Sequence, residues 1–200
     1  MPSSKNNKSI NGNVLGLCEV DGFCPWEFFD LDENSFVVDL GAFRGDFSQY
    51  ILDKYNCRVD AYEPINFGCY LVNHPKFRLI KEVVFDGREV FFNRESESPG
   101  GHIFSQAGEL VKTIDIRDIV KEHIDLLKVN IEGAEVQALR VADLSNVDQI
   151  LVEFHLFMMK DKEEAMKEIR ETINHIMSFK FQVKQINESG PAFLFYGKIA

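Results

Sequence analysis

The sequence predicts one doubly wound α/β domain with a mostly parallel seven-stranded sheet that ends in an antiparallel hairpin. From Ser35 onward, short apolar runs alternate with segments of helical period, which is typical of βα units that build a parallel sheet. A glycine-rich turn follows the first of these runs, as is usual beside the first strand of a doubly wound fold. Near the C-terminus, two apolar runs flank the turn residues Asn-Glu-Ser-Gly-Pro at 187–191, which favours a hairpin.

Length and composition favour one domain and disfavour several kinds of partner. With 200 residues, 45% of them apolar, the chain can bury the core of one domain, which we place at 14–200 after a flexible polar tail at 1–13. The formal net charge of -10 and the lack of a Lys/Arg-rich run disfavour nucleic acid as a partner. The chain has no apolar signal core and no apolar stretch of the ~20 residues that cross a membrane, so we expect a cytoplasmic protein without membrane contact.

The expected elements follow one another along the chain. Apolar runs predict strands at 36–40, 58–62, 77–84, 124–130 and 149–154, hairpin strands at 181–186 and 192–196, and an antiparallel arm at 89–93. Helical spacing and capping residues predict a helix from Phe47 to Tyr55 that ends at Asn56, one at 64–72 opened by Pro64, a short one after Asp115, and one at 134–141.

Two further segments complete the predicted organisation. A long helix after Asp161 has an apolar face made of Ala165, Met166, Ile169, Ile173, Ile176 and Met177. The segment 94–108 clusters Ser, Gly and Pro without a period, so we expect a mobile loop that can act as a lid.

The turn after the first strand, Asp39-Leu-Gly-Ala-Phe-Arg-Gly45, favours one kind of nucleotide over another. Gly41 and Gly45 permit a sharp turn and let backbone N–H groups approach a ligand. Phe43 stands where a dinucleotide-binding motif has its second glycine, so nicotinamide cofactors are disfavoured. The carboxylate of Asp39 suits a ligand with a positive ammonium or sulfonium group, which S-adenosylmethionine has. The alternative is that both glycines only shape a tight connection.

A second acidic residue strengthens the nucleotide hypothesis. Glu63 ends the second strand about twenty positions after the glycines, where a carboxylate can accept hydrogen bonds from both ribose hydroxyls of an adenosine. The alternative is that Glu63 stabilises the start of the helix opened by Pro64 through the helix dipole. Both roles can hold together.

Four sequence blocks resemble the successive motifs of the FkbM-type methyltransferases. They are Val-Asp-Leu-Gly-Ala-Phe-Arg-Gly-Asp-Phe-Ser at 38–48, Tyr-Glu-Pro at 62–64, Val-Lys-Thr-Ile-Asp-Ile-Arg-Asp at 111–118 and Asp-Leu-Leu-Lys-Val-Asn-Ile-Glu-Gly-Ala-Glu at 125–135. The last block is the most distinctive. The resemblance implies a class I methyltransferase (Rossmann-like) fold, S-adenosylmethionine as the methyl donor, and an oxygen acceptor on a sugar, glycan or secondary metabolite.

The same resemblance assigns the residues that bind the cofactor. Asp39 and the two glycines would surround the methionine end, Glu63 would hold the ribose, and Asp86 after the third strand would approach the adenine. Ser48 would cap the cofactor side of the first helix. The full predicted set is Asp39, Gly41, Ala42, Gly45, Phe47, Ser48, Glu63, Pro64 and Asp86.

Polar side chains at the ends of the fourth and fifth strands form the candidate catalytic cluster. Lys128, Asn130 and Glu132 follow the strand period of two, so we expect them on one side of the sheet. Glu153 and His155 do the same on the next strand. The ordinary pKa of histidine lies near neutral pH, which suits His155 as a general base that Glu153 orients.

Each member of this cluster also has a structural interpretation. Lys128 and Glu132 could form an ion pair, Glu135 could lie on a solvated helix face, and His155 could bond a backbone carbonyl. The family usually has Asp where this chain has Asn130, and an amide is a poor base and a weak ligand for a hard cation. We therefore assign no metal ligands; a divalent metal is left open but not favoured.

The sequence thus predicts a methyltransferase that uses S-adenosylmethionine to methylate a hydroxyl group, with a small molecule or glycan as acceptor. Two alternatives stay open. One is an N-methyltransferase; the other is a regulatory module that binds S-adenosylmethionine without turnover, which the Asn130 departure allows. The motifs carry no indication of an oligomeric state.

Overall fold

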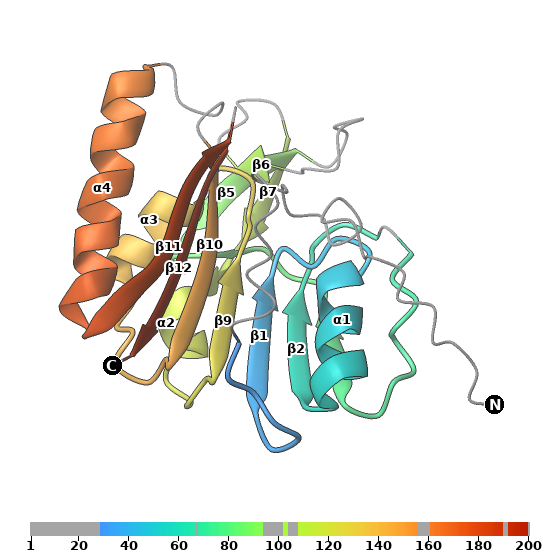
Figure 1. Ribbon diagram of the computed structural model, residues 1–200. Helices are drawn as coiled ribbons and strands as arrows, with labels where there is room; N and C mark the ends of the chain where they lie inside the picture. Colours follow the sequence, from blue (N-terminus) through green and yellow to red (C-terminus); the bar gives the residue numbers. More distant parts are fainter. Residues whose placement is uncertain are drawn as a thin grey trace.

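A seven-stranded sheet with strand order β11-β12-β10-β9-β1-β2-β3 forms the centre of the protein (Figure 1). The computed structural model describes residues 29–66, 68–93, 102–103, 108–155, 161–189 and 192–199. The predicted tail at 1–13 lies outside them. The sheet strands are β1 (Phe36–Leu40), β2 (Arg58–Tyr62), β3 (Phe77–Ile80), β9 (Leu126–Val129), β10 (Gln149–His155), β11 (Phe181–Ser189) and β12 (Ala192–Ile199).

The strand directions confirm the predicted fold class. β3, β2, β1, β9 and β10 pair in parallel in this order, whereas β12 runs antiparallel to both β10 and β11. The predicted C-terminal hairpin is therefore present, and both of its strands extend beyond the apolar runs that predicted them. Because β1 has β2 on one side and β9 on the other, the strand order reverses there, and ligands of doubly wound folds bind at this point.

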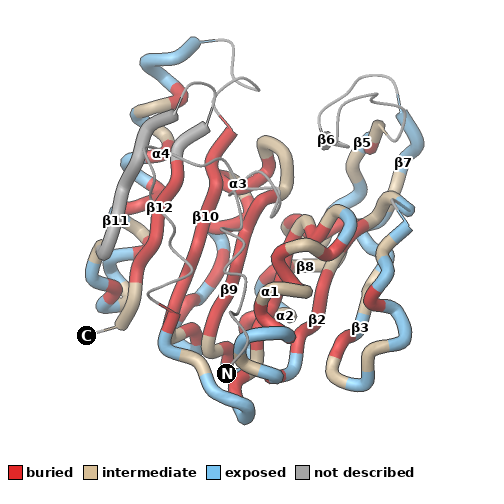
Figure 2. The backbone as a smooth tube through the Cα atoms, turned by 45° about the vertical axis from the view of Figure 1, so that its right-hand side comes forward, coloured by how far each residue is buried: buried red, intermediate tan, exposed pale blue. Residues whose placement is uncertain are grey.

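Helices cover both faces of the sheet, so the structure has three layers (Figure 1). α1 (Asp46–Tyr55) packs on one face, where Phe47, Ile51 and Leu52 share a core with Val37 and Leu126. α2 (Ile116–Ile119), α3 (Glu135–Val141) and α4 (Lys162–Ser178) cover the other face. Figure 2 shows β9 and β10 buried throughout, as a parallel sheet between two helical layers requires.

Capping residues place the ends of two helices where the sequence predicted them. Asn56 ends α1 in a left-handed conformation, with φ of 50°, and its N–H donates to the carbonyl of Leu52. At the start of α4, the carboxylate of Asp161 accepts from the N–H groups of Glu163 and Glu164. On the predicted apolar face of α4, Met177 is 42% exposed. Its assignment to the buried face was wrong: Ile176 in the same turn is fully buried, so Met177 lies at the edge of the apolar face.

Two predictions between β2 and β9 were wrong. Among the described residues 63–66 and 68–76 no helix forms after Pro64; instead the chain makes a series of turns. The strand predicted at 77–84 is two strands, because β3 ends at Ile80 and β4 (Val84–Phe85) leaves the large sheet to pair with β8 (Ile114–Asp115). The sequence pattern does not reveal such a change of partner, since both strands contain apolar residues.

A separate three-stranded sheet of β5 (Glu89–Asn93), β6 (His102–Ile103) and β7 (Glu109–Lys112) stands at the carboxyl end of the large sheet (Figures 1 and 2). The predicted arm at 89–93 is β5, which pairs antiparallel with β6 and β7. Within the predicted loop at 94–108, residues 102–103 form β6, while 94–101 and 104–107 lie outside the described residues. None of the described helices is long and apolar enough to cross a membrane.

Gly41 brings the ends of β1 and β9 into direct contact. It has a φ of +80°, and a Cβ atom there would lie 1.7 Å from the carbonyl oxygen of Asn130. A backbone carbonyl held in a parallel sheet cannot move away as a flexible side chain can. The position therefore requires glycine for space as well as for conformation.

We expect Gly41→Ala to destabilise the fold by about 3–5 kcal/mol, since neither chain can give way. Gly68→Ala is the matched control. Gly68 also has a positive φ, of +76°, but no atom lies within 4 Å of a Cβ placed there. The control should lose only the conformational cost of about 1–2 kcal/mol. Urea denaturation measures both; equal losses would show that the Asn130 contact does not constrain position 41.

Candidate active site

The glycine turn after β1 is held mainly by hydrogen bonds within the protein. The N–H groups of Gly41 and Ala42 both donate to the carbonyl of Tyr62, at 2.9 and 3.1 Å, and Gly45 donates to the carbonyl of Ala42. The N–H groups of Gly41 and Ala42 are therefore not among those that the glycines leave for a ligand. They fix the turn against the end of β2 instead.

Glu63 lies immediately after β2 and joins the two ends of the predicted cofactor site. One carboxylate oxygen accepts from the N–H of Phe43 in the glycine turn and the other from the N–H of Ile65, both at 2.9 Å. The residue is 7% exposed. Burial raises the pKa of its carboxyl group, the hydrogen bonds from the two N–H groups lower it, and the net effect is a raised pKa. Each oxygen keeps a further lone pair, which fits the predicted bonds to ribose hydroxyls.

Asp39 and Lys128 form a buried ion pair between β1 and β9. The Lys128 Nζ lies 2.9 Å from one carboxylate oxygen of Asp39, and the Ser48 hydroxyl donates to the other at 2.7 Å. The ammonium also donates to the carbonyl of Gly41 at 2.6 Å. Two buried charges at adjacent register positions thus neutralise each other directly beneath the turn.

This arrangement changes the roles expected for two residues. Lys128 pairs with Asp39, so the structural interpretation of an ion pair with Glu132 was wrong. Ser48 bonds Asp39 from within α1, whereas the N-cap of that helix is Gly45, without a side-chain bond. The predicted capping role of Ser48 was therefore also wrong.

Other members of the predicted cofactor set lie in different surroundings. Ala42 is buried, Pro64 is half-buried in the turns after β2, and the Phe47 side chain is 1% exposed and packs edge-on against the Phe29 ring. The Phe47 ring therefore belongs to the core under α1.

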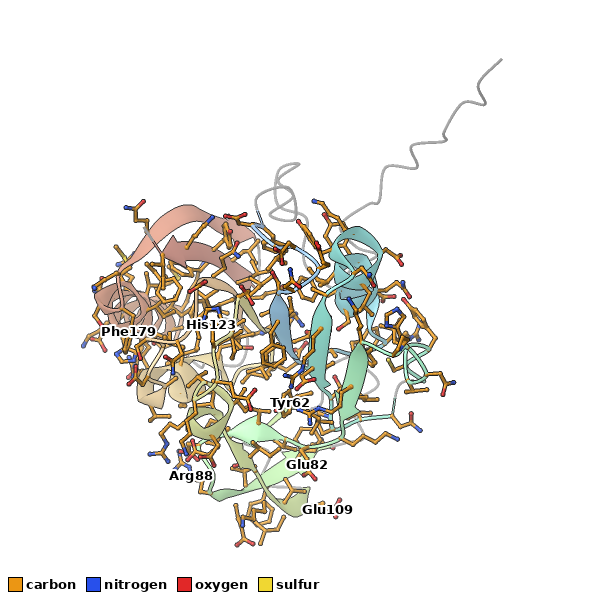
Figure 3. The ribbon with its side chains drawn as sticks, turned by 90° about the horizontal axis from the view of Figure 1, so that it is seen from below. Tyr62, Glu82, Arg88, Glu109, His123 and Phe179 are labelled. Atoms are coloured by element: carbon orange, nitrogen blue, oxygen red, sulfur yellow. The ribbon has the colours of Figure 1, made fainter. Side chains whose placement is uncertain are left out.

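Asp86 follows β4 and not β3, so the position predicted for it at the end of the third strand was wrong. Its carboxylate pairs with Arg88 at 2.8 Å, and Arg88 lies beside the small sheet, away from β1 and β2 (Figure 3). The residues that directly follow β3 are Lys81 and Glu82, and both are exposed.

The ends of β9 and β10 are joined by a buried amide–carboxylate contact. The Asn130 side-chain amide donates to a carboxylate oxygen of Glu153 at 2.8 Å. Asn130 is 9% exposed and Glu153 is 4% exposed. The prediction that these strand ends converge is confirmed by this contact, and it places a carboxylate within bonding distance of the residue that departs from the family pattern.

Glu135, the first residue of α3, is a buried member of the cluster that the sequence interpretation missed. It is 1% exposed, so its assignment to a solvated helix face was wrong. Its carboxylate accepts from the N–H groups of Ile131 and Gly133 at 3.0 and 3.1 Å and lies 2.9 Å from the Nδ1 of His155. Its place in the Glu-Gly-Ala-Glu block was a signal, but its contact with His155 depends on two elements twenty residues apart.

Besides Glu135, the carboxylates of Glu132 and Glu153 act on His155. Its Nε2 lies 3.6 Å from Glu132, which has a left-handed φ of 52° and so does not continue the strand period expected for it. Burial alone would lower the pKa of His155. The hydrogen bond to Glu135 and the charges of Glu135, Glu132 and Glu153 outweigh burial and raise the pKa to about 9. The expectation of an ordinary pKa near neutrality was therefore wrong, and His155 is an imidazolium at pH 7.

These contacts divide the carboxyl edge of the sheet into two parts. We call the first the cofactor-side cluster, made of Asp39, Lys128, Ser48, Glu63 and the turn from Gly41 to Gly45. We call the second the acceptor-side cluster, made of Asn130, Glu132, Glu135, Glu153 and His155. Gly41 packs directly on the backbone of Asn130, so the two clusters meet at the point where the strand order reverses.

The family model described as methyltransferase FkbM domain matches residues 39–181, which is most of the chain. The chain belongs to this family. The resemblance seen in the four sequence blocks is therefore confirmed. The match spans both clusters, from Asp39 through His155 to the start of β11.

Solved structures show that the fold is that of class I methyltransferases. The fibrillarin pre-rRNA processing protein of Methanococcus jannaschii aligns with a TM-score of 0.53 and 12% identity, over 84% of this chain and 67% of that one. A ribosomal protein L11 methylase from Lactobacillus delbrueckii subsp. bulgaricus aligns with a TM-score of 0.50 and 11% identity, over 84% and 71%.

TrmK of M. capricolum, solved with S-adenosyl-homocysteine, aligns with a TM-score of 0.50 and 9% identity, over 84% of this chain and 64% of that one. This chain thus spans about two thirds of the length of these proteins. No curated protein matches the sequence.

The raised pKa of His155 predicts a loss of stability in alkaline solution. A group with a folded pKa above its unfolded value stabilises the fold fully below the unfolded pKa of 6.5, and this stabilisation is lost as the pH rises through about 9. We expect the contribution to be about 3 kcal/mol. Urea denaturation at pH 6.5 and 9.5 should show this fall in the parent protein and a much smaller one in His155→Gln.

His123→Gln is the matched control for this measurement. The side chain of His123 is 60% exposed at the opposite edge of the sheet, so solvent screens its charge. We expect His123→Gln to show the same decrease in the free energy of unfolding between pH 6.5 and 9.5 as the parent protein. If this decrease were as small as in His155→Gln, the assignment to His155 would be contradicted.

Proposed function

We propose that this protein is an S-adenosylmethionine-dependent methyltransferase that methylates a hydroxyl group of a small molecule or glycan. The proposal rests on one observation above others. Within a methyltransferase family match, a buried acidic residue, Glu63, bonds the glycine turn at the point where the strand order reverses. Family and fold supply the reaction class; the acceptor class is our inference.

The residues of the cofactor-side cluster fit S-adenosylmethionine. Glu63 has lone pairs for the two ribose hydroxyls, and the glycine turn lies beside it. The carboxylate of Asp39 is already neutralised by Lys128, so we propose that it acts mainly by holding the turn. When bound, S-adenosylmethionine supplies an electrophilic methyl group on a sulfonium centre.

The acceptor-side cluster provides groups that can take a proton from a hydroxyl. Methyl transfer forms an O–CH₃ bond and breaks the S–CH₃ bond, and the hydroxyl proton passes to a base. His155 is already protonated at neutral pH, which makes it a poor base, whereas Glu153 and Glu132 are carboxylates. Of these two, Glu153 is buried and is held by Asn130, so we propose Glu153 as the base.

The contact between Asn130 and Glu153 also bears on the regulatory alternative. The family pattern has a carboxylate at the position of Asn130, and its loss alone would remove a base. Here the amide of Asn130 donates to a carboxylate on the neighbouring strand, so a base is still present. This observation favours an enzyme over a module that binds without turnover.

The carboxylates around His155 also favour a neutral acceptor. The cluster holds Glu132, Glu135 and Glu153 against one imidazolium, so a phosphorylated acceptor would be repelled. This agrees with the formal net charge of -10 and supports a glycan or small molecule over nucleic acid.

Isothermal titration with S-adenosylmethionine tests the cofactor. We expect the parent protein to bind and Glu63→Ala to bind at least tenfold more weakly, since it loses bonds to a charged group. Glu122→Gln is the control, because Glu122 is exposed and pairs with Arg58 at the opposite edge of the sheet. If the parent protein released no heat and gained no thermal stability with the cofactor, the proposal would be refuted.

A radiolabelled methyl-transfer screen over sugars, phenols and peptides tests turnover and the base. We expect activity on hydroxyl acceptors, and a loss of at least about 100-fold in Glu153→Gln, which cannot take the proton. His155→Gln should lose less. A Glu153→Gln variant within threefold of the parent would exclude Glu153 as the base, and binding without transfer to any acceptor would favour the regulatory module.

A further inference from the structure

Beyond their last paired residues, β9 and β10 are no longer joined by backbone hydrogen bonds. The parallel register of these strands ends at Val129 and Val152, and the N–H of Asn130 donates across to the carbonyl of Leu40 on β1. The acceptor-side cluster therefore lies past the ladder that aligns the two strands. Its geometry depends on side-chain contacts.

Besides the hydrogen bond between Asn130 and Glu153, the Glu135 side chain connects the two strand ends. On one side its carboxylate accepts from the N–H groups of Ile131 and Gly133, in the turn that follows Asn130. On the other side the same carboxylate lies 2.9 Å from the Nδ1 of His155, the last residue of β10. One buried side chain thus bonds to both strand ends.

The turn that Glu135 holds has a costly backbone conformation. Glu132 and Gly133 both have positive φ values, 52° and 95°. The left-handed conformation costs a non-glycine residue about 1–2 kcal/mol, so it persists only where the surroundings determine it. The N–H groups on both sides of Glu132 donate to the same carboxylate, which supplies that constraint.

The contact with Glu135 also fixes the orientation of the His155 ring. With Nδ1 against Glu135, the ring presents Nε2 toward Glu132 at 3.6 Å. Among the described residues, the charged groups that act on the ring are Glu135 from α3, Glu132 from the turn and Glu153 from β10 itself. Of these, Glu135 alone makes a hydrogen bond to the ring in the described part of the chain.

We propose that Glu135 is a positioning residue, which aligns the Asn130–Gly133 turn with His155 and so sets the geometry of the acceptor side. It acts through the groups that it holds and does not itself touch the acceptor. This inference rests on the proposed function, because it assigns the cluster to the acceptor. It assigns to the last residue of the Glu-Gly-Ala-Glu block the contact between the turn after β9 and the last residue of β10.

The experiment compares Glu135→Gln with Glu132→Gln by NMR. Both variants remove one carboxylate near His155, but only the first weakens the bonds to the turn, because a glutamine amide offers one uncharged acceptor oxygen in place of a charged carboxylate. We expect Glu135→Gln to lower the pKa of His155 by more than one pH unit, and to speed amide hydrogen exchange at Ile131 and Gly133 at least tenfold. Glu132→Gln should lower the pKa less and leave that exchange within threefold of the parent protein.

Further measurements separate positioning from general loss of structure. Amide exchange at Gly41 and Ala42, which bond Tyr62, should stay within threefold of the parent in both variants, as should the affinity for S-adenosylhomocysteine. Unchanged exchange at Ile131 and Gly133 in Glu135→Gln, or an equal fall in the pKa of His155 in both variants, would overturn the proposal.

The parent protein provides a test even if Glu135→Gln does not fold. We expect a slowly exchanging Nδ1 proton of His155 below pH 8, and its absence would overturn the contact with Glu135. If S-adenosylhomocysteine does not bind the parent protein, the proposed function fails, while the titration and exchange still decide whether Glu135 holds the cluster.

Discussion

The ion pair between Asp39 and Lys128 is the interaction on which the arrangement of the site depends. Both side chains are almost completely buried, at adjacent positions of β1 and β9. Removing one partner would leave an uncompensated charge inside the sheet, at a cost of about 3–5 kcal/mol. The pair also binds the carbonyl of Gly41 and the hydroxyl of Ser48, so it fixes the glycine turn and α1 relative to both strands.

The glycine turn then connects the two clusters. Its backbone lies so close to Asn130 that no side chain fits at Gly41, and Phe43 contributes its N–H to Glu63. A change in the conformation of the turn would therefore displace both Glu63 after β2 and Asn130 after β9. This coupling is a direct result of placing both clusters where the strand order reverses, since three strand ends meet there.

The acceptor-side cluster is built differently, from side chains that lie beyond the last paired residues of β9 and β10. Three carboxylates surround one imidazolium, and the resulting field holds His155 in its charged form. An imidazolium with both ring nitrogens near carboxylates can orient them and offset part of their repulsion. The carboxylate of Glu153 is held in place by the Asn130 amide, and its negative charge is only partly offset by the imidazolium. Base and cation are thus separate residues in this site.

Sequence patterns alone determined the fold class, the succession of the central strands along the chain, the glycine turn and the ends of two helices. Asn56 and Asp161 cap helices through bonds to residues at most four positions away, so a local pattern is sufficient to predict them. The positions of Asn130, Glu153 and His155 at strand ends followed from the period of two. The motif blocks identified the family before any geometry was available.

The tertiary structure decided which of these residues touch. Lys128 pairs with Asp39 because parallel register brings residues 89 positions apart together, and no local pattern carries that register. Asp86 lies outside the predicted site because the strand that precedes it, β4, pairs with β8 and not with the large sheet. The pKa of His155 is raised because a hydrogen bond to Glu135 and the charges of three carboxylates on different elements outweigh the opposing effect of burial. Local patterns and motifs predicted most strands, two helix ends and the family. The partners and the protonation state of the site residues depend on distances between segments far apart in the sequence, which only folding sets.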